Sequence, residues 1–145
     1  MRRGWRHGAC ATGLVLAATL GWPGDVAAQE QSTWSGVYTD AQASRGKTVY
    51  DESCTVCHGE NLAGGELGPP LAGSGFLEFW QGLTLADVHQ VMSISMPQDN
   101  PGSLEAAQYV DIIAYMLRTS EFPTGGDELS EDTLGEITIQ VEQEP

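Results

Sequence analysis

Cys54-Thr55-Val56-Cys57-His58 is the most informative stretch of this 145-residue sequence. Its two cysteines stand three positions apart, and a histidine follows them directly. The third cysteine of the chain, Cys10, lies near the N-terminus. A disulfide framework in a secreted protein ties distant segments together, which two cysteines three positions apart cannot do. The pair therefore indicates a different chemistry.

The spacing Cys-x-x-Cys-His is typical of covalent haem c attachment. At the end of a helix, thiols three residues apart lie on neighbouring faces and can both reach the vinyl groups of one haem. The adjacent histidine then projects beneath the ring and places an imidazole nitrogen on the iron. We therefore predict one covalently bound haem c, attached through Cys54 and Cys57 and ligated by His58.

Two other uses of a Cys-x-x-Cys pair fit the sequence less well. A structural zinc site needs four ligands, and only His89 and carboxylates remain to complete one. A thioredoxin-like pair starts a helix within a strand-helix-strand unit. Here the pair ends a predicted helix, and no predicted strands flank it.

The N-terminus carries the features of a secretory signal peptide. A basic run, Met1–His7, precedes the small and apolar residues 8–20, and Val26-Ala27-Ala28 provides an Ala-x-Ala-like cleavage site. A retained membrane anchor is the alternative, but the apolar run is shorter than the roughly 20 residues that span a bilayer. We expect residues 1–28 to be removed, leaving a periplasmic or otherwise exported protein without a transmembrane anchor.

The chain that follows this segment is strongly acidic. Residues 29–145 contain three basic residues against 19 acidic ones, a formal net charge of −16. Such a charge excludes nucleic acid as a partner, because the phosphates would be repelled. It suits docking to a basic face of a partner protein, and it equally suits an acidic surface whose only effect is to keep the protein soluble.

Three segments carry helical periodicity, and Gly- and Pro-rich loops separate them. They are residues 40–57, 84–94 and 104–119. We expect N-terminal caps at Thr39 or Asp40, at Thr84 and at Ser103. The intervening loop 59–75 holds six glycines and two prolines, and a loop this long inside a compact domain is usually functional. The sequence predicts an all-α domain over residues 40–120.

Two further segments flank this domain. Residues 29–39 are polar with a few aromatics, and we expect an irregular lead-in. Residues 121–145 form an acidic C-terminal extension in which five apolar residues are spaced apart: Leu129, Leu134, Ile137, Ile139 and Val141. We expect the extension to pack on the domain, because these side chains need cover; the alternative is a disordered acidic tail.

From about Asp40 to Thr119 the chain resembles the class I cytochromes c. More narrowly, it is similar to small bacterial cytochrome c modules found beside or fused to quinoprotein alcohol dehydrogenases. The matching elements, in order, are RGKTVYDESCTVCHG, GPPLAG, FLEFWQGLT, SMPQDNPGSL and YVDIIAYML. The resemblance implies about three main helices around one haem, and the tail FPTGGDELSEDTLGEITI resembles extensions of some bacterial members.

The resemblance also implies the second axial ligand, a methionine from the loop before the last helix. Met96 fits, because it precedes a proline and follows His58 by 38 residues. Met92 is the nearest rival, although its helical position is typical of core. His89 would give a bis-histidine haem instead.

Other roles follow from the same match. Pro69 corresponds to the family proline whose carbonyl accepts the proton of the His58 ring, with Pro70 as the adjacent alternative. Gly46 and Tyr50 correspond to first-helix residues that cross the last helix near Tyr115. Trp80 is expected either at the haem edge or in the core. The apolar side chains expected to enclose the ring are Leu62, Leu71, Val88, Val91 and Ile112.

The resemblance implies a one-electron carrier, not an enzyme. Two protein ligands leave no open position on the iron, and a thioether ligand raises the reduction potential. The expected partners are a redox enzyme that donates electrons, such as a quinoprotein dehydrogenase, and an electron acceptor protein. Two alternatives stay open: a haem subunit of a larger redox complex with the tail as a docking arm, and a gas- or peroxide-reactive cytochrome with an open iron site.

Overall fold

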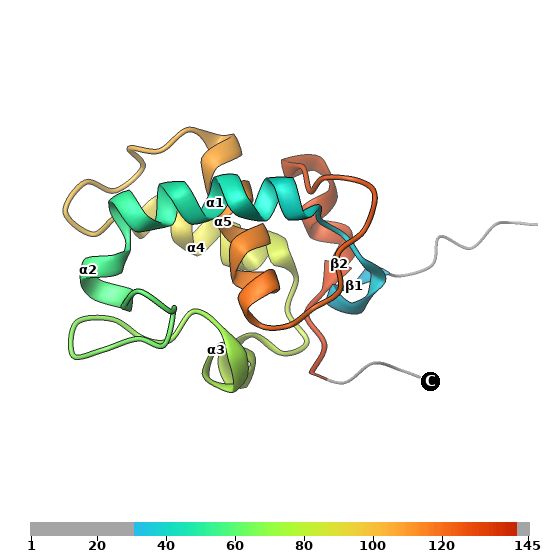
Figure 1. Cartoon of the computed structure of the whole chain (residues 1–145), viewed down its shortest axis with the longest axis horizontal. Helices are drawn as coiled ribbons and strands as arrows, with labels where there is room; N and C mark the ends of the chain where they lie inside the picture. Colours follow the sequence, from blue (N-terminus) through green and yellow to red (C-terminus); the bar gives the residue numbers. More distant parts are fainter. Residues whose placement is uncertain (1–30, 142–145) are drawn as a thin grey trace, which may run out of the picture.

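The computed structural model describes residues 31–141, so the predicted signal peptide 1–28 lies outside them. The helices are α1 (Asp40–Ser53), α2 (Thr55–His58), α3 (Gly73–Trp80), α4 (Leu85–Ser95) and α5 (Ala106–Thr119), as Figure 1 shows. Two 3-10 helices, η1 (Thr33–Ser35) and η2 (Glu131–Glu136), and two short strands, β1 (Gln31–Ser32) and β2 (Ile137–Thr138), complete the described elements. Within residues 31–141, no helix is both long and apolar enough to cross a membrane. The predicted all-α class is confirmed.

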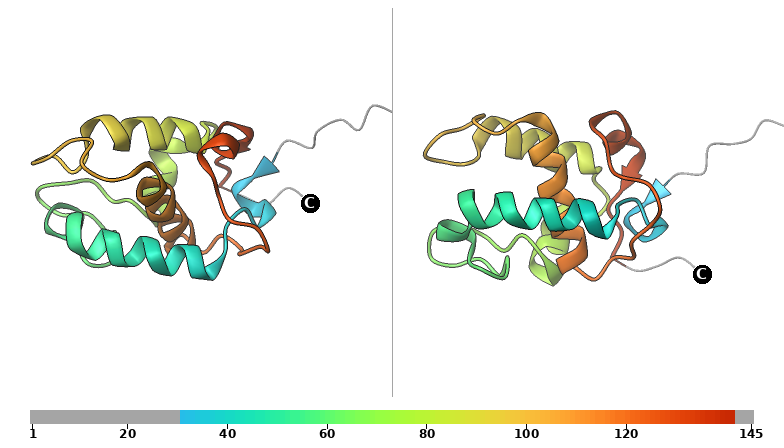
Figure 2. Two further views of the ribbon diagram at one scale, coloured as in Figure 1. Left: turned by 90° about the horizontal axis from the view of Figure 1, so that it is seen from above. Right: turned by 45° about the horizontal axis from the view of Figure 1, so that its top comes forward.

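Helix α1 crosses α5 at very short range, and this crossing organises the core (Figures 1 and 2). A Cβ atom added to Gly46 would lie 1.8 Å from the backbone oxygen of Asp111, so the two backbones touch where α1 has no side chain. Next to the contact, the rings of Tyr50 and Tyr115 meet edge to face at 5.4 Å. The predicted crossing of the first and last helices is present.

Polar residues cap the starts of α1, α4 and α5, and the cap of α5 differs from the expectation. Thr39 accepts a hydrogen bond from the amide of Gln42, and Thr84 forms a reciprocal capping box with Asp87. The third helix of the prediction does not begin at Ser103. The amide of Ser103 instead donates to the carbonyl of Asn100 and closes a turn, and α5 is capped two residues later, by Glu105.

Two other boundaries also differ from the expectation. The helix predicted over 40–57 is interrupted at Cys54, whose φ of −127° and ψ of −24° end α1 before α2 begins. Helix α3 begins inside the predicted loop 59–75 and lies outside the three predicted helices, because Gly73 and Gly75 weaken the local helical pattern. A side chain at Gly75 would meet the ring of Pro70 at 2.5 Å, so a tight contact explains that glycine.

The C-terminal extension packs on the domain and pairs with the lead-in. Strand β2 runs parallel to β1, with Gln31 opposite Ile137. The lead-in is therefore more regular than expected. Four of the five apolar residues of the extension are buried, whereas Val141 is 38% exposed. The buried ones are Leu129, Leu134, Ile137 and Ile139.

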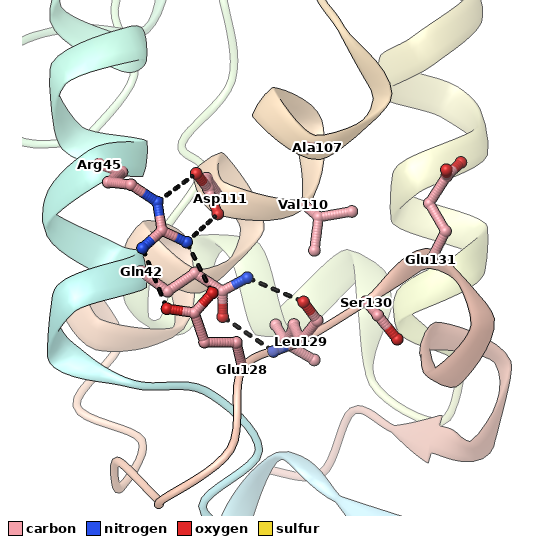
Figure 3. A pocket seen from close by; sticks show the side chains of 9 residues that line it. All are labelled: Gln42, Arg45, Ala107, Val110, Asp111, Glu128, Leu129, Ser130 and Glu131. Carbon is pink, nitrogen blue, oxygen red and sulfur yellow. Dashed lines mark hydrogen bonds and ion pairs between the residues drawn. The ribbon is translucent and has the colours of Figure 1, made fainter.

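Figure 3 shows how the extension is fastened to α1 and α5. The Arg45 guanidinium bonds Asp111 of α5 at 3.0 Å and Glu128 of the extension at 2.8 Å. The side-chain amide of Gln42 bonds both backbone groups of Leu129 at 2.9 Å. A shallow pocket lies among these residues, but the polar groups of Arg45 and Gln42 are already engaged within the protein. We assign no ligand to it.

Candidate haem site

The Cys-x-x-Cys-His segment forms one tight turn. The amides of Cys57 and His58 both donate to the carbonyl of Cys54, at 3.2 and 3.0 Å. The amide of Cys54 in turn donates to Tyr50 at the end of α1, which ties the turn to that helix. Both thiols are unlinked and partly buried. The turn therefore places the two sulfurs on one short helical surface, as attachment to a single ring requires.

The imidazole of His58 is held by the glycine- and proline-rich loop. It is 6% exposed, and its Nδ1 lies 2.8 Å from the carbonyl oxygen of Pro69. Because a carbonyl can only accept, Nδ1 carries the proton and Nε2 keeps its lone pair for a metal. The contact involves Pro69 and not Pro70.

A glycine lets the loop approach this ring. A Cβ atom at Gly68 would lie 2.9 Å from both Cε1 and Nδ1 of His58, and 2.9 Å from the carbonyl of Cys57. Any side chain there would push the loop away from the imidazole. The sequence showed only a glycine-rich loop, whereas the structure identifies Gly68 as the glycine that the contact with His58 requires.

The three candidates for the sixth ligand have different surroundings. Met96 ends α4 in an extended conformation and is partly buried, outside the core cluster. Met92 packs against the core cluster. The Nε2 of His89 is buried without a hydrogen-bond partner and lies 3.7 Å from a carboxylate oxygen of Glu131, so this ring faces η2 of the extension. Of the three, Met96 is the one that neither packs against the core cluster nor lies beside a carboxylate of the extension.

The apolar residues expected around a haem fall into two groups. Leu62, Val88 and Ile112 are buried in the core cluster, and Leu71 packs against it. Val91 is 46% exposed and lies outside the cluster. Trp80 also packs against the core, and its ring stacks on Phe76 at a centroid distance of 6.3 Å.

The cysteine pair does not have the electrostatics of a redox dithiol. Burial, followed by the neighbouring Cys57, raises the pKa of Cys54 to about 11. A nucleophilic Cys-x-x-Cys pair requires the opposite, a lowered thiol pKa. Among residues 31–141 no cluster of three or more His, Cys, Asp or Glu is arranged to hold a metal ion.

The donor set fits haem c. The chain offers two unlinked thiols for the ring, an imidazole with its outer nitrogen free, and a thioether on a second segment. The loops that follow α2 and α4 project at the same end of the molecule, away from β1 and β2 (Figure 2, left). The ligand-bearing segments therefore share one end of the fold.

Two tyrosines contact these segments, and the sequence gave no sign of it. The hydroxyl of Tyr50 donates to Gly59, and the hydroxyl of Tyr109 donates to Met96. Both residues lie on apolar helical faces, where the pattern predicts only core packing. No sequence signal distinguishes a bonded buried phenol from an ordinary aromatic core residue.

Comparisons with known proteins agree with this geometry. The family described as cytochrome C oxidase, cbb3-type, subunit III matches residues 41–116. Cytochrome c-551 of Bacillus subtilis (strain 168) is 40% identical over 52 residues, which is 36% of this chain and 46% of that protein. The cbb3-type cytochrome c oxidase subunit CcoP of Azospirillum brasilense is 52% identical over 46 residues, which is 27% of this chain and 16% of that protein.

A similar fold occurs in a solved structure, the sulfane dehydrogenase SoxCD from Paracoccus pantotrophus. The likeness has a TM-score of 0.53 at 20% identity, and it covers 82% of this chain and 68% of that one. At this identity the likeness concerns the fold alone. The matched regions span less than half the length of both curated relatives.

Proposed function

Because the chain belongs to the family of cytochrome c oxidase, cbb3-type, subunit III, as a class I cytochrome c domain, we propose that it carries single electrons on one haem c held between His58 and Met96. The observation that carries this proposal is the 2.8 Å contact between His58 Nδ1 and the Pro69 carbonyl. It leaves the imidazole with one nitrogen free to bind a metal and fixes the orientation of the ring.

Each residue of the site has a distinct task. Cys54 and Cys57 anchor the haem through thioether bonds, and Pro69 keeps His58 basic and correctly turned. Met96 supplies a soft sulfur that favours the ferrous state. When bound, the haem supplies a one-electron ferric–ferrous couple. Because His58 and Met96 would both ligate the iron, substrate would have no access to it, so electron transfer is favoured over catalysis.

The setting of this activity follows from the N-terminal segment and the charge. Export to the periplasm rests on the signal peptide expected in residues 1–28. The acidic surface suits redox partners with basic faces. The relatives named above include subunits of redox enzymes, which fits a donor such as a quinoprotein dehydrogenase and a separate electron acceptor.

The test uses the purified holoprotein. We expect a weak far-red absorption band that reports iron–sulfur ligation, and haem that stays on the chain through acid denaturation and solvent extraction. Met96→Ala should abolish the band, lower the reduction potential and admit carbon monoxide to the ferrous iron. Met92→Ala is the matched control and should keep the band. Loss of the band in Met92→Ala but not in Met96→Ala would reverse the ligand assignment, and extractable haem would refute the proposal.

A further inference from the structure

Three buried tyrosines of the described chain each donate a hydrogen bond to a backbone carbonyl. The donor–acceptor distances are 2.6 Å for Tyr50 to Gly59, 2.7 Å for Tyr109 to Met96 and 2.6 Å for Tyr38 to Phe122. The three tyrosines are 0%, 3% and 0% exposed. The same chemical contact therefore occurs three times, and two of its acceptors belong to the segments that carry His58 and Met96.

The contact of Tyr109 falls on a place where the chain changes direction. Met96 ends α4, and its amide still bonds Met92 at 2.9 Å, but its backbone has turned to an extended conformation. The carbonyl of Met96 accepts the Tyr109 hydroxyl and, at 3.3 Å, the amide of Gly102. Tyr109 thus fastens the first residue of the loop to α5.

The ring of Tyr109 is itself fixed by its neighbours. It belongs to α5 and meets the ring of His89 on α4 edge to face at 6.0 Å, so it is buried between its own helix and α4. A hydroxyl on a ring with so little freedom defines the position of the carbonyl that it bonds. The position of Met96 is therefore tied to packing between two helices and not to the loop alone.

Tyr50 makes the corresponding contact on the other side. It lies on α1, and its hydroxyl bonds the carbonyl of Gly59, the residue after His58. The surrounding backbone is closed by two further bonds, from Gly59 to Thr55 and from Gly64 to His58, each 2.9 Å. Tyr50 lies within α1, and its hydroxyl bonds a residue that follows the end of that helix. It therefore connects the closed turn to α1.

We propose that Tyr50 and Tyr109 are positioning residues, whose hydroxyls set the backbone beside His58 and at Met96 from the two helices that cross at Gly46. The proposal rests on the function proposed above. Helices α1 and α5 are in backbone contact at their crossing, so their separation is fixed. Two hydroxyls on these helices therefore fix the distance between the backbone beside His58 and the backbone at Met96. The two loop segments alone would define that distance less closely.

Displacement of Met96 by external imidazole tests the role of Tyr109. Imidazole binds ferric iron only when the methionine has left, so its apparent affinity measures how often the ligand loop opens. Tyr109→Phe keeps the ring and removes one hydrogen bond. We expect its apparent imidazole affinity to rise about three- to tenfold, the range that corresponds to one lost hydrogen bond.

Tyr38→Phe is the matched control. It removes the same kind of bond from an equally buried ring, but the acceptor, Phe122, lies in the C-terminal extension. We expect this variant to unfold at a lower denaturant concentration with its imidazole affinity unchanged within about twofold, because a local opening is insensitive to a distant contact. An equal rise in affinity in both variants would show that the tyrosines act only through global stability, and would overturn the proposal.

The role of Tyr50 is tested by low-temperature electron paramagnetic resonance of the ferric protein. The largest g value depends on the orientation of the axial ligands, so Tyr50→Phe should shift or broaden it, whereas Tyr38→Phe should leave it unchanged. An unchanged spectrum in Tyr50→Phe would overturn its assignment. A wild-type protein that lacks the far-red band would instead refute the proposed ligation itself, which keeps the two failures distinguishable.

Discussion

At the scale of the residue, Gly46 and Gly68 each permit a close contact that a side chain would prevent. Each allows a backbone to touch a group that any Cβ atom would displace: the carbonyl of Asp111 at Gly46, and the ring of His58 at Gly68. The first contact sets the helix crossing, and the second brings the Pro69 carbonyl to the imidazole. The absence of a side chain is therefore the functional property of both positions.

Gly46→Ala should destabilise the fold strongly. The added methyl group would lie 1.8 Å from the Asp111 carbonyl oxygen, so α1 and α5 would have to separate. Overpacking of a well-packed contact costs about 1–3 kcal/mol, and the involvement of two backbones places this case at or above about 3 kcal/mol. Urea unfolding of the holoprotein measures the change. Gly126→Ala, which meets nothing within 4 Å, is the control and should change the free energy of unfolding by less than about 1 kcal/mol.

At the scale of the element, the C-terminal extension is part of the core and does not behave as a free arm. It lays Leu134, Ile137 and Ile139 into the cluster formed by the main helices. The amide of Ile139 bonds Leu83 at 2.8 Å, and its carbonyl accepts the amide of Gly82 at 2.8 Å. These bonds hold the residue that follows β2 against the connection between α3 and α4. A segment with this burial and bonding supports the domain that it covers.

Ile139→Ala should therefore cost about 2–5 kcal/mol of unfolding free energy, as for other fully buried large-to-small changes. Ile139 is 0% exposed, whereas Val141, two residues further on, is 38% exposed. Val141→Ala is the control, and we expect it to cost less than about 1 kcal/mol. Equal effects of the two substitutions in urea unfolding would show that the extension is loosely attached in solution.

The elements also show which features a sequence can predict. Helices α4 and α5 were predictable because amphipathic periodicity and the Thr84 cap are local signals. The alternating Ile137 and Ile139 similarly indicated an extended, covered segment. Helix α3 was missed because Gly73 and Gly75 serve tertiary contacts, with Ser120 and with Pro70, and weaken the local helical signal.

The residues of the site also include some that the sequence could predict and some that it could not. The Cys-x-x-Cys-His segment and the proline opposite His58 could be located from spacing and resemblance. The contacts of Tyr50 and Tyr109 could not, because the partner of a phenol hydroxyl depends on how helices distant in sequence are oriented. Ser103 shows the converse error: a residue with good capping chemistry had its amide committed to a loop turn.

At the scale of the whole molecule, charge is distributed unevenly. Between Lys47 and Arg118 the sequence contains neither lysine nor arginine, so α2, α3, α4 and their loops carry no such side chain. Arg45 and Lys47 bond carboxylates of this chain, and Arg118 bonds Ser44. The end that bears His58 is consequently anionic, with exposed Glu60 and Glu66 on the loop after α2.

Oxidation of the reduced holoprotein by small complexes should reveal this charge. A trivalent cobalt phenanthroline cation should react more slowly as salt is added, and ferricyanide more quickly, because salt screens both interactions. Glu60→Gln combined with Glu66→Gln should slow the cationic oxidant about two- to fivefold at low salt. Glu121→Gln combined with Glu136→Gln changes the net charge equally and should have a smaller effect. Equal effects of the two pairs would mean that net charge, and not its location, governs the encounter.

The parallel pairing of β1 with β2 has a consequence for how this domain can be joined to others. It brings Gln31 and Ile137 together at the end of the molecule opposite α2 (Figure 1). A polypeptide entering before residue 31 and one leaving after residue 141 would pass through neighbouring points. The domain can therefore be inserted within a longer chain, or fused at either terminus, while the end that bears His58 remains accessible.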